Sequence, residues 1–331
     1  MRTQDHHLEG LYGLPAFTFP APGETTRLPE PDAVAWRIGY ERWTSEEPWA
    51  ETFGRFCAEV DTTRVRALIV GNWHDMESDD PSEVIEALLS KRDRLPALRS
   101  MFLGDITDIE CKLSRISQTD VTPLLAGFPA LEEFGVRAGE GVSMEGVMRL
   151  EFPALRHTAL RRLTVESSGL PVEVVRGVGA SDLPALEHLE LWLGSSDEGV
   201  DCCEVADLEP ILSGARLPRL RHLALRNSEI LDEVAAAMAS APVVARLDVL
   251  DLSLGTLGDD GAAALLGGQP LTHLKRLDLH HNFLSEPFRQ RIRQALEPAG
   301  VEMDLDQDDA ESYVGGDGTV WREICVGPVS Y

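Results

Sequence analysis

The chain has 331 residues, 43% of them hydrophobic, so it is long enough for two ordinary domains or for one elongated repeat array with a large core. Its 56 Asp and Glu residues against 30 Lys and Arg residues give a formal net charge of -26, which would repel phosphate backbones and anionic lipid headgroups. We therefore expect no nucleic-acid partner and no membrane partner.

The N-terminus and the cysteines predict a cytoplasmic protein. The first ten residues contain no apolar segment typical of a secretion signal, and no run of 18 apolar residues occurs along the chain. The five cysteines are too few and too scattered for a disulfide framework, so we expect reduced thiols. We interpret His6 and His7 as part of a disordered terminus.

Residues 1–60 are predicted to form an N-terminal capping region. The first thirty residues are rich in Pro, Gly and Thr, and their order would depend on docking. Residues 33–40 alternate as a half-buried strand does, and an amphipathic helix with Ser45 as its N-cap is expected to follow. Its apolar face is formed at helical spacing by Trp49, Phe53, Phe56, Cys57 and Val60.

Residues 61–306 are predicted to form a repeat array, because one apolar pattern recurs along them. Residues 217–225 follow the pattern L-x-x-L-x-x-L-x-L, and residues 95–103, 128–136, 183–191 and 271–279 keep its spacing. We take the first apolar residue of the final pair as the anchor of each expected strand. The anchors are separated by 26 to 34 residues and are Leu68, Met101, Phe134, Leu163, Leu189, Leu223, Leu250, Leu277 and Met303.

Helix signals fill the segments between the anchors. We expect helices over residues 81–89, 205–212, 231–239, 259–266 and 286–296, and Gly214 and Gly267 suit helix C-caps. A unit this short cannot bury its own apolar side, so the units must stack and form the core between neighbours. Because strands pack more closely than helices, the array is expected to curve with the sheet on its concave side.

These repeats resemble those of leucine-rich-repeat proteins, and the spacing of 26 to 29 residues with helices is similar to the ribonuclease-inhibitor-like class. Residues 250–266 carry the resemblance most fully. It implies an α/β fold: a right-handed leucine-rich-repeat solenoid with a parallel concave sheet, helices on the convex side and caps at both ends. The chain departs from the family at the turn Asn five residues after each anchor, which occurs only as Asn282. The low lysine content is typical of GC-rich genomes, so the chain is similar to bacterial members.

Residues 307–331 break the pattern and are predicted to form a C-terminal cap. An acidic loop precedes an alternating segment with Val320, Arg322, Ile324 and Val326 on one side, which indicates a strand. The gap after Met303 is too short for another helical crossover. We therefore expect an antiparallel hairpin that covers the edge of the last strand.

The strand register predicts a recognition face. Residues before, between and after the two core positions of a repeat strand point away from the core. An exposed Trp192 beside Arg226 would be a typical binding hot spot, and the nearby carboxylates would favour a basic partner segment. The predicted binding residues are Arg137, Arg162, His188, Glu190, Trp192, His222, Arg226, Asp251, Arg276, Asp278, His280 and Asp304.

We therefore predict a non-catalytic module that binds a protein or peptide, with no cofactor and no metal. The alternative is an accessory or catalytic component of a small-molecule or peptide-modifying pathway that uses the His and carboxylate columns of the same face. The chain lacks phosphate-loop, nucleophile-elbow and dinucleotide motifs, and its acidic run fails as a calcium loop because Asp309 replaces the turn glycine. The register also predicts that Leu223→Asp disrupts the array, whereas Ala224→Asp is tolerated on the open face. The oligomeric state is not determined by the sequence.

Overall fold

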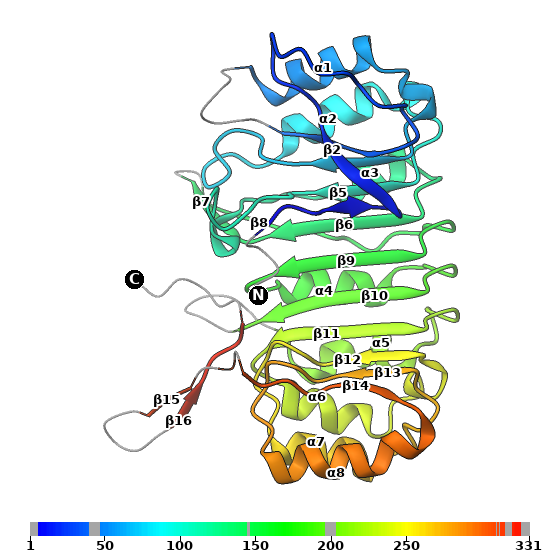
Figure 1. Ribbon diagram of the computed structural model, residues 1–331, viewed down its shortest axis with the longest axis vertical. Helices are drawn as coiled ribbons and strands as arrows, with labels where there is room; N and C mark the ends of the chain where they lie inside the picture. The colour runs from blue at the N-terminus through cyan, green and yellow to red at the C-terminus, as the bar shows by residue number, and fades with distance from the viewer. Residues whose placement is uncertain are drawn as a thin grey trace. The chain divides into compact units, whose positions relative to one another are not determined.

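A computed structural model of the chain describes residues 6–39, 47–143, 146–195, 203–308, 310, 312–314 and 320–325. Its helices are α1 (Trp49–Glu59), α2 (Ser82–Ser90), α3 (Thr122–Gly127), α4 (Val172–Ala180), α5 (Glu209–Ser213), α6 (Leu231–Met238), α7 (Asp259–Gly267) and α8 (Glu286–Leu296) (Figure 1). Its strands are β1 (Gly10–Leu11), β2 (Leu14–Thr18), β3 (Ala35–Ile38), β4 (Ala67–Val70), β5 (Ser100–Leu103), β6 (Glu133–Ala138), β7 (Glu140–Ser143), β8 (Gly146–Arg149), β9 (Arg162–Ser167), β10 (His188–Gly194), β11 (His222–Ser228), β12 (Val249–Asp251), β13 (Arg276–Asp278), β14 (Glu302–Asp304), β15 (Ser312–Val314) and β16 (Val320–Arg322).

Twelve of these strands form one open, mostly parallel sheet in the order β1-β2-β3-β4-β5-β6-β9-β10-β11-β12-β13-β14. β1 and β2 pair antiparallel, whereas the neighbours from β2 to β6 and from β10 to β14 pair parallel. β7 with β8 and β15 with β16 form separate two-stranded sheets. The α/β class predicted from the repeats is confirmed, because helical crossovers join the consecutive parallel strands from β3 to β6 and from β10 to β14.

The predicted anchors lie in register with one another. Leu68 pairs with Met101, and Met101 pairs with Phe134. Across β10 to β14 the aligned positions are Leu189, Leu223, Leu250, Leu277 and Met303. The ladder also extends into the predicted capping region, since Trp36 of β3 pairs with Leu68. The repeat spacing therefore predicted both the strands and their alignment.

Most of the predicted helices form within two residues of the expected bounds. The exception is the segment 205–212, which divides into a 3-10 helix, Val205–Leu208, and the short helix α5. The apolar face of α1 is buried as predicted, while Ser45 lies outside the described residues. Gly214 ends α5 in the left-handed conformation, with φ 63°, as a C-cap glycine does. Gly267 is instead the last residue of α7, and Gly268 follows with a negative φ.

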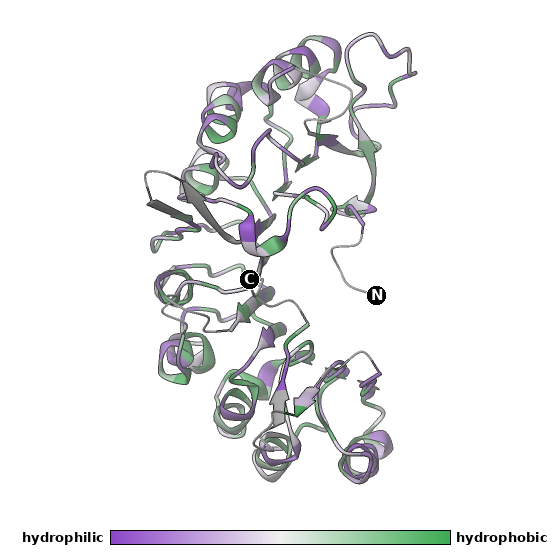
Figure 2. Ribbon diagram, turned by 90° about the vertical axis from the view of Figure 1, so that its left-hand side faces the viewer, coloured by the Kyte–Doolittle hydropathy of each residue, from purple (hydrophilic) through white to green (hydrophobic). Residues whose placement is uncertain are grey.

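The chain divides into two compact units, one of residues 1–153 and 157–166 and the other of residues 154–156 and 167–331. In the first unit the helices α1 to α3 lie together on one side of the strands, and in the second unit α4 to α8 do the same (Figure 2). The buried leucines and valines of each unit fill the layer between its strands and helices. The predicted boundaries at residues 60 and 306 separate the capping regions from the repeat array, and they stay a prediction.

In the first unit an N-terminal strap, which we define as residues 7–16, packs on the sheet face that points away from the helices. Leu11 is buried in a cluster with Ala35, Ala67, Ile69 and Phe102, which belong to β3, β4 and β5. Leu8, Tyr12, Leu14 and Ala16 pack against the same cluster. These strands therefore carry apolar side chains on both faces, and the chain itself covers the second face.

Asp105, which is fully buried, holds the strap by hydrogen bonds. Its Oδ1 accepts a hydrogen bond from the Leu8 backbone N–H at 3.0 Å, and its Oδ2 accepts one from Arg37 Nε at 2.7 Å. His7 Nδ1 lies 3.1 Å from the Asp105 carbonyl oxygen, and Arg37 also donates to the Leu8 carbonyl. The prediction that His7 belongs to a disordered terminus is wrong, because a buried carboxylate requires partners and the strap supplies them.

Asn282 is the turn residue that the family resemblance singles out, and it is fully buried. Its Nδ2 donates to the carbonyls of Leu252 and Leu279 at 2.9 and 3.1 Å, and its Oδ1 accepts from the Leu257 N–H at 3.0 Å. In β11, two strands earlier, Asn227 stands one position closer to its anchor and donates to the Ser167 carbonyl at 3.3 Å. The turns are therefore satisfied by different side chains, which explains why the family Asn does not recur.

The predicted C-terminal hairpin exists, but its predicted place is wrong. β15 and β16 pair antiparallel with each other and form no ladder with β14, which stays at the end of the strand order among the described residues. The hairpin instead contacts the loops of the second unit. The Cys325 N–H donates to the Leu254 carbonyl at 3.0 Å, and the Arg322 guanidinium lies 5.1 Å from the Phe283 ring centre. Val326 lies outside the described residues.

Two further sequence-based expectations concern thiols and membrane spans. Among the described cysteines, Cys57, Cys111, Cys203 and Cys325, no disulfide links one to another, while Cys202 lies outside the described residues. Burial raises the pKa of the Cys111 thiol to about 12, so it is protonated at neutral pH. Among the described residues no helix has the length and apolar character that a bilayer crossing requires.

Candidate functional site

In the second unit one column of side chains crosses β10 to β14 on the face predicted for recognition. The column lies between the core positions of each strand, and its members in register are Glu190, Ala224, Asp251, Asp278 and Asp304. Three carboxylates therefore stand side by side on β12, β13 and β14. Because adjacent strands lie about 4.8 Å apart, this row concentrates negative charge unless cations lie beside it.

Arg226 bridges the carboxylates at one end of the row. Its Nη1 lies 2.9 Å from Glu190 Oε1, and its Nε lies 3.3 Å from Asp251 Oδ2 and 2.8 Å from Ser253 Oγ. Trp192 donates from Nε1 to the same Glu190 oxygen at 2.8 Å, and the guanidinium lies 5.6 Å from its ring centre. These four polar side chains and the indole form a closed hydrogen-bonded cluster, which we call the Arg226 cluster.

The Arg226 cluster corrects the predicted hot spot. Trp192 has no exposed surface, and the Arg226 side chain is 16% exposed with its donors engaged by neighbours in the same unit. The prediction of an exposed Trp192 beside Arg226 is therefore wrong. Alternation correctly placed both residues on the face, but it does not report whether side chains there pack on one another.

The electrostatics of the cluster follow from burial and from Arg226. Burial alone raises the pKa of Glu190, but His188, Arg226 and Trp192 outweigh it and hold that pKa well below its usual range. Burial raises the pKa of Asp251, Asp278 adds to the effect, and Arg226 only partly opposes it. Burial lowers the pKa of Arg226, yet Asp251 and Glu190 raise it further than burial lowers it. Arg226 thus stays charged and is the internal counterion of the two carboxylates.

The structure changes the predicted effect of replacing Ala224 with aspartate. Ala224 is fully buried and lies in register between Glu190 and Asp251, so the expectation that Ala224→Asp is tolerated no longer holds. A third carboxylate between two others would be buried without a cation, and we expect it to lower the free energy of unfolding by about 2 kcal/mol or more.

Urea unfolding of Ala224→Asp, with Ala224→Ser as the matched small polar control, measures this effect. The serine variant is expected to stay within about 1 kcal/mol of the parent protein. Equal stability of the aspartate variant and the parent would show that this position is open to water.

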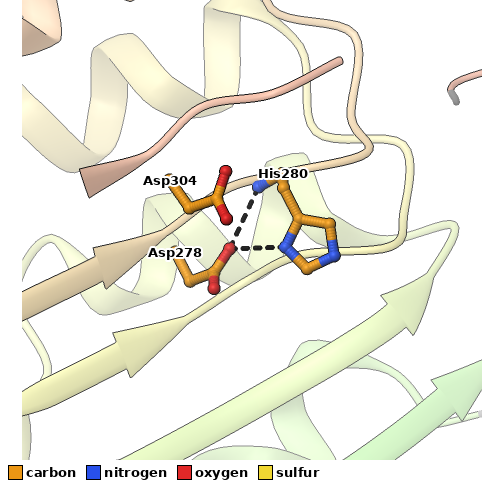
Figure 3. Close-up of side chains that lie close together, drawn as sticks. All are labelled: Asp278, His280 and Asp304. Carbon is orange, nitrogen blue, oxygen red and sulfur yellow. Dashed lines mark hydrogen bonds and ion pairs between the residues drawn. The ribbon is translucent and has the colours of Figure 1, made fainter. Parts of the chain in front are cut away.

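The other end of the row is partly exposed and forms a second cluster, Asp278, His280 and Asp304 (Figure 3). His280 Nδ1 lies 2.6 Å from Asp278 Oδ1, and the His280 backbone N–H donates to the same oxygen at 3.2 Å. The side chains of Asp278, His280 and Asp304 are 7%, 29% and 41% exposed. Solvent and ligands therefore reach the imidazole and Asp304, while the nearly buried Asp278 holds the imidazole in place.

Arg276 is the counterion of this cluster. Its Nη2 donates to Asp278 Oδ2 at 2.7 Å and lies 3.7 Å from Asp304 Oδ2, and its Nη1 donates to Glu302 Oε1 at 3.0 Å. Glu302 is exposed and stands in the column before the anchor Met303. It was missed among the predicted site residues, although the same count along the strand identifies it.

The titration behaviour of the cluster is set by the Asp278 and His280 pair. Burial raises the pKa of Asp278, but the hydrogen bonds from His280 and Arg276 prevail and lower it to about 2. Burial lowers the pKa of His280, but the bond to Asp278 and its charge raise it above the ordinary value. The pair therefore favours a protonated imidazole, which can donate from Nε2 to an incoming acceptor.

The same three residues are the set in the described part of the chain that could hold a metal ion. One ligand atom from each of Asp278, His280 and Asp304 lies within 4.8 Å of the others. Two oxygens and one imidazole nitrogen are ligands that Zn²⁺ accepts. Arg276 weakens the fit, because its guanidinium already lies beside both carboxylates and would repel a cation there.

The remaining predicted site residues lie elsewhere. Arg137, in the first unit, is buried and bonded to Glu166 at 2.7 Å and to the Ile106 carbonyl, so it is a structural residue. Arg162 is about half exposed and pairs with Glu133 at 3.3 Å. The ring centres of His188 and His222, on neighbouring strands, are 3.8 Å apart, and His188 is buried. In the predicted set of the second unit, the side chains of Arg276, His280 and Asp304 are 40%, 29% and 41% exposed.

Comparisons with known proteins concern the fold and not the site. No family model and no curated protein matches the sequence. A crystal structure of a Bacteroides fragilis protein aligns with 82% of this chain and 74% of that chain, at 24% identity and a TM-score of 0.71. A leucine-rich-repeat protein of Leptospira interrogans aligns at 13% identity over 83% of this chain and 90% of that chain, but its TM-score is 0.24. The first likeness shows a shared fold, and the second is too low to argue from.

Proposed function

We propose that this chain is a non-catalytic binding module of the leucine-rich-repeat type, with the right-handed, ribonuclease-inhibitor-like arrangement that its repeats resemble. The proposed partner is a basic protein or peptide segment held on the face of β10 to β14 that points away from the helices. Supporting this are the aligned repeat anchors and the shared fold with a solved bacterial protein. The proposed compartment is the cytoplasm.

The observation that carries this proposal is the row of carboxylates at the β12 to β14 end. Asp251, Asp278 and Asp304 stand in register, and Glu302 and Asp306 continue the acidic surface at its exposed margin. Arg276 is the cation that the exposed Glu302 and Asp304 share, so the margin keeps a net negative charge. A Lys- or Arg-containing segment would complete the neutralisation that Arg226 already provides at the other end of the row.

A defined basic peptide tests the proposal. We expect a fluorescent peptide with alternating Arg and Ser residues to bind the protein at low salt, and to bind the Glu302→Gln/Asp304→Asn variant at least about tenfold more weakly, which corresponds to 1.4 kcal/mol. The matched control is Glu233→Gln/Asp260→Asn, which removes two acidic charges from the helices α6 and α7.

Fluorescence anisotropy at two salt concentrations is the measurement. Equal loss of binding in both double variants would mean that net charge alone attracts the peptide, and would contradict a site on this face. Stronger salt dependence in the parent protein than in the Glu302→Gln/Asp304→Asn variant is the expected accompaniment.

The second candidate is the metal or general-base role for the Asp278, His280 and Asp304 cluster. The Asp278 and His280 contact supports it, because a carboxylate that holds Nδ1 orients the opposite ring nitrogen outward. The imidazole must first lose the proton that this contact favours, so the role requires a pH above the raised pKa of His280. Calorimetric titration with Zn²⁺ separates the two candidates. Binding of about one ion per chain by the parent protein, lost in His280→Ala, would favour this role. Weaker peptide binding by Glu302→Gln/Asp304→Asn, without zinc binding by the parent protein, would favour the first candidate.

A further inference from the structure

We propose that a pocket in the first unit, at the starts of β4 to β6, binds the anionic group of a small molecule, a phosphate monoester or a carboxylate. The pocket has a volume of about 460 Å³ and is lined chiefly by Arg64, Arg66, Arg99, Tyr12, Asp32 and Glu132. Small-molecule sites occupy about 300 to 1,000 Å³, so the volume suits such a ligand. This site is separate from the face of the second unit and does not depend on its proposed role.

Three arginines around one pocket are unusual in a chain whose formal net charge is -26. Arg66 and Arg99 occupy equivalent positions before neighbouring strands, since the Arg99 and Ser100 N–H groups both donate to the Arg66 carbonyl, at 2.8 and 3.1 Å. The fold thus places two guanidinium groups on adjacent rungs of the ladder. Like charges side by side on neighbouring strands are destabilising unless an anion lies between them.

The carboxylates near the pocket satisfy these arginines unequally. Arg64 forms ion pairs with two carboxylates: its Nη1 lies 2.9 Å from Glu30 and its Nη2 lies 2.7 Å from Asp32. Arg99 donates from Nη1 to the Pro96 and Leu98 carbonyls at 3.2 and 2.8 Å. Its ion pair is long, because its Nε lies 3.8 Å from a Glu132 carboxylate that also accepts the Tyr12 hydroxyl at 3.0 Å.

Arg66 is the least satisfied of the three. Its guanidinium lies 5.1 Å from the Tyr12 ring centre and has a hydrogen bond with the Tyr12 hydroxyl, and within the described part of the chain it has no carboxylate at ion-pair distance. Arg66 and the remaining donors of Arg99 therefore line the pocket, where a bidentate anion can engage them, as guanidinium groups engage phosphates and carboxylates.

Tyr12 couples the pocket to the N-terminal strap. Its ring packs on Arg66 and its hydroxyl donates to Glu132, so one wall of the pocket belongs to the strap and the others belong to the repeat units. A ligand that engages Arg66 beneath the ring binds only when the strap is in place. Ligand binding is therefore expected to slow amide exchange in the strap, residues 7–16.

Isothermal titration with phenyl phosphate and with benzoate tests the proposal and separates the two anion classes. These probes share an aromatic ring for Tyr12 and differ in the anionic group. We expect at least one of the two probes to bind saturably, with one molecule per chain. Its affinity is expected to be at least about tenfold lower for Arg66→Ala/Arg99→Ala. The control Arg216→Ala/Arg219→Ala removes the same charge from exposed positions in the second unit and is expected to bind as the parent does.

Two further results keep the outcome decisive. Arg66→Lys/Arg99→Lys keeps the charge but loses the planar fork, and its affinity is expected to fall between those of the parent and the alanine variant. Hydrogen exchange of the strap in the parent protein is expected to slow with the bound probe. Absence of saturable binding by both probes, or equal weakening in the Arg216 and Arg219 control, would overturn the proposal.

Discussion

Replacing Arg226 with methionine is expected to lower the free energy of unfolding by about 3 to 5 kcal/mol, because it leaves two carboxylates without their shared cation. Glu190 and Asp251 are 16% and 11% exposed and both lie within ion-pair distance of the guanidinium. The Trp192 indole would also lose the cation that packs beside it. Urea unfolding followed by tryptophan fluorescence and by circular dichroism measures the loss.

Arg276→Met is the matched control for this prediction. Arg276 also bridges carboxylates on the same face, but its side chain is 40% exposed, and exposed ion pairs contribute about 1 kcal/mol or less. A clear difference between the two variants is the expected result. Equal stability of Arg226→Met and the parent protein would show that water, and not Arg226, neutralises Glu190 and Asp251.

Replacing Asp105 with asparagine is expected to lower the free energy of unfolding by about 3 kcal/mol and to release the strap. The carboxylate is fully buried, and the Arg37 side chain that it pairs with is 12% exposed, so the variant leaves a nearly buried guanidinium without its counterion. Limited proteolysis is expected to cleave near residues 7–16 faster than in the parent protein. Asp108→Asn, in an exposed pair with Lys112, is the control and is expected to leave cleavage unchanged.

The attachment of the strap is also expected to depend on pH. Burial raises the pKa of Asp105, but His7, Arg37 and the Leu8 N–H lower it overall, so its contribution is present above its ordinary value of 3.8 and is lost as the pH falls through the lowered pKa. The hydrogen bond to Asp105 raises the pKa of His7 overall, although burial opposes it. The His7 contribution is complete below the ordinary value of 6.5 and is lost as the pH rises through the raised pKa.

The strap is therefore expected to exchange its amides most slowly between about pH 4 and pH 6. The His7 effect is the smaller one, because its side chain is 39% exposed and solvent screens it. Hydrogen exchange corrected for the intrinsic pH dependence measures this window, and His7→Gln is expected to remove the change at its alkaline side only. A flat profile in the parent protein would contradict the role of both groups.

The repeat strands and their alignment were predictable because apolar spacing is a local property. Anchors such as Leu223 and Leu250 are spaced by the length of one strand and one helix, and stacking of equal units then forces them into register. The polar column that contains Asp278 and Asp304 follows from the same count, since strand side chains alternate between faces.

The accessibility of that column was not predictable, because it depends on what each side chain meets. Trp192 and Ala224 stand on the predicted face but are buried, since the Arg226 cluster closes over this part of the sheet. Asp105 lies just after β5 and belongs to none of the predicted columns. Its role as the hydrogen-bond partner of the N-terminal strap is visible only in the folded structure, where the strap lies over the same strands. Contacts between residues about 100 positions apart have no signature in local spacing.

By itself the sequence determined the α/β repeat class, the strand register and the list of polar residues on the face opposite the helices, because all three depend on short periodicities in one chain. Only the tertiary structure decided which of those residues are neutralised internally and which meet solvent. Arg226 is enclosed with two carboxylates, whereas Arg276, His280 and Asp304 stay accessible. The physical reason is that desolvation of a charge depends on every neighbour in space, and those neighbours are set by folding of the whole unit.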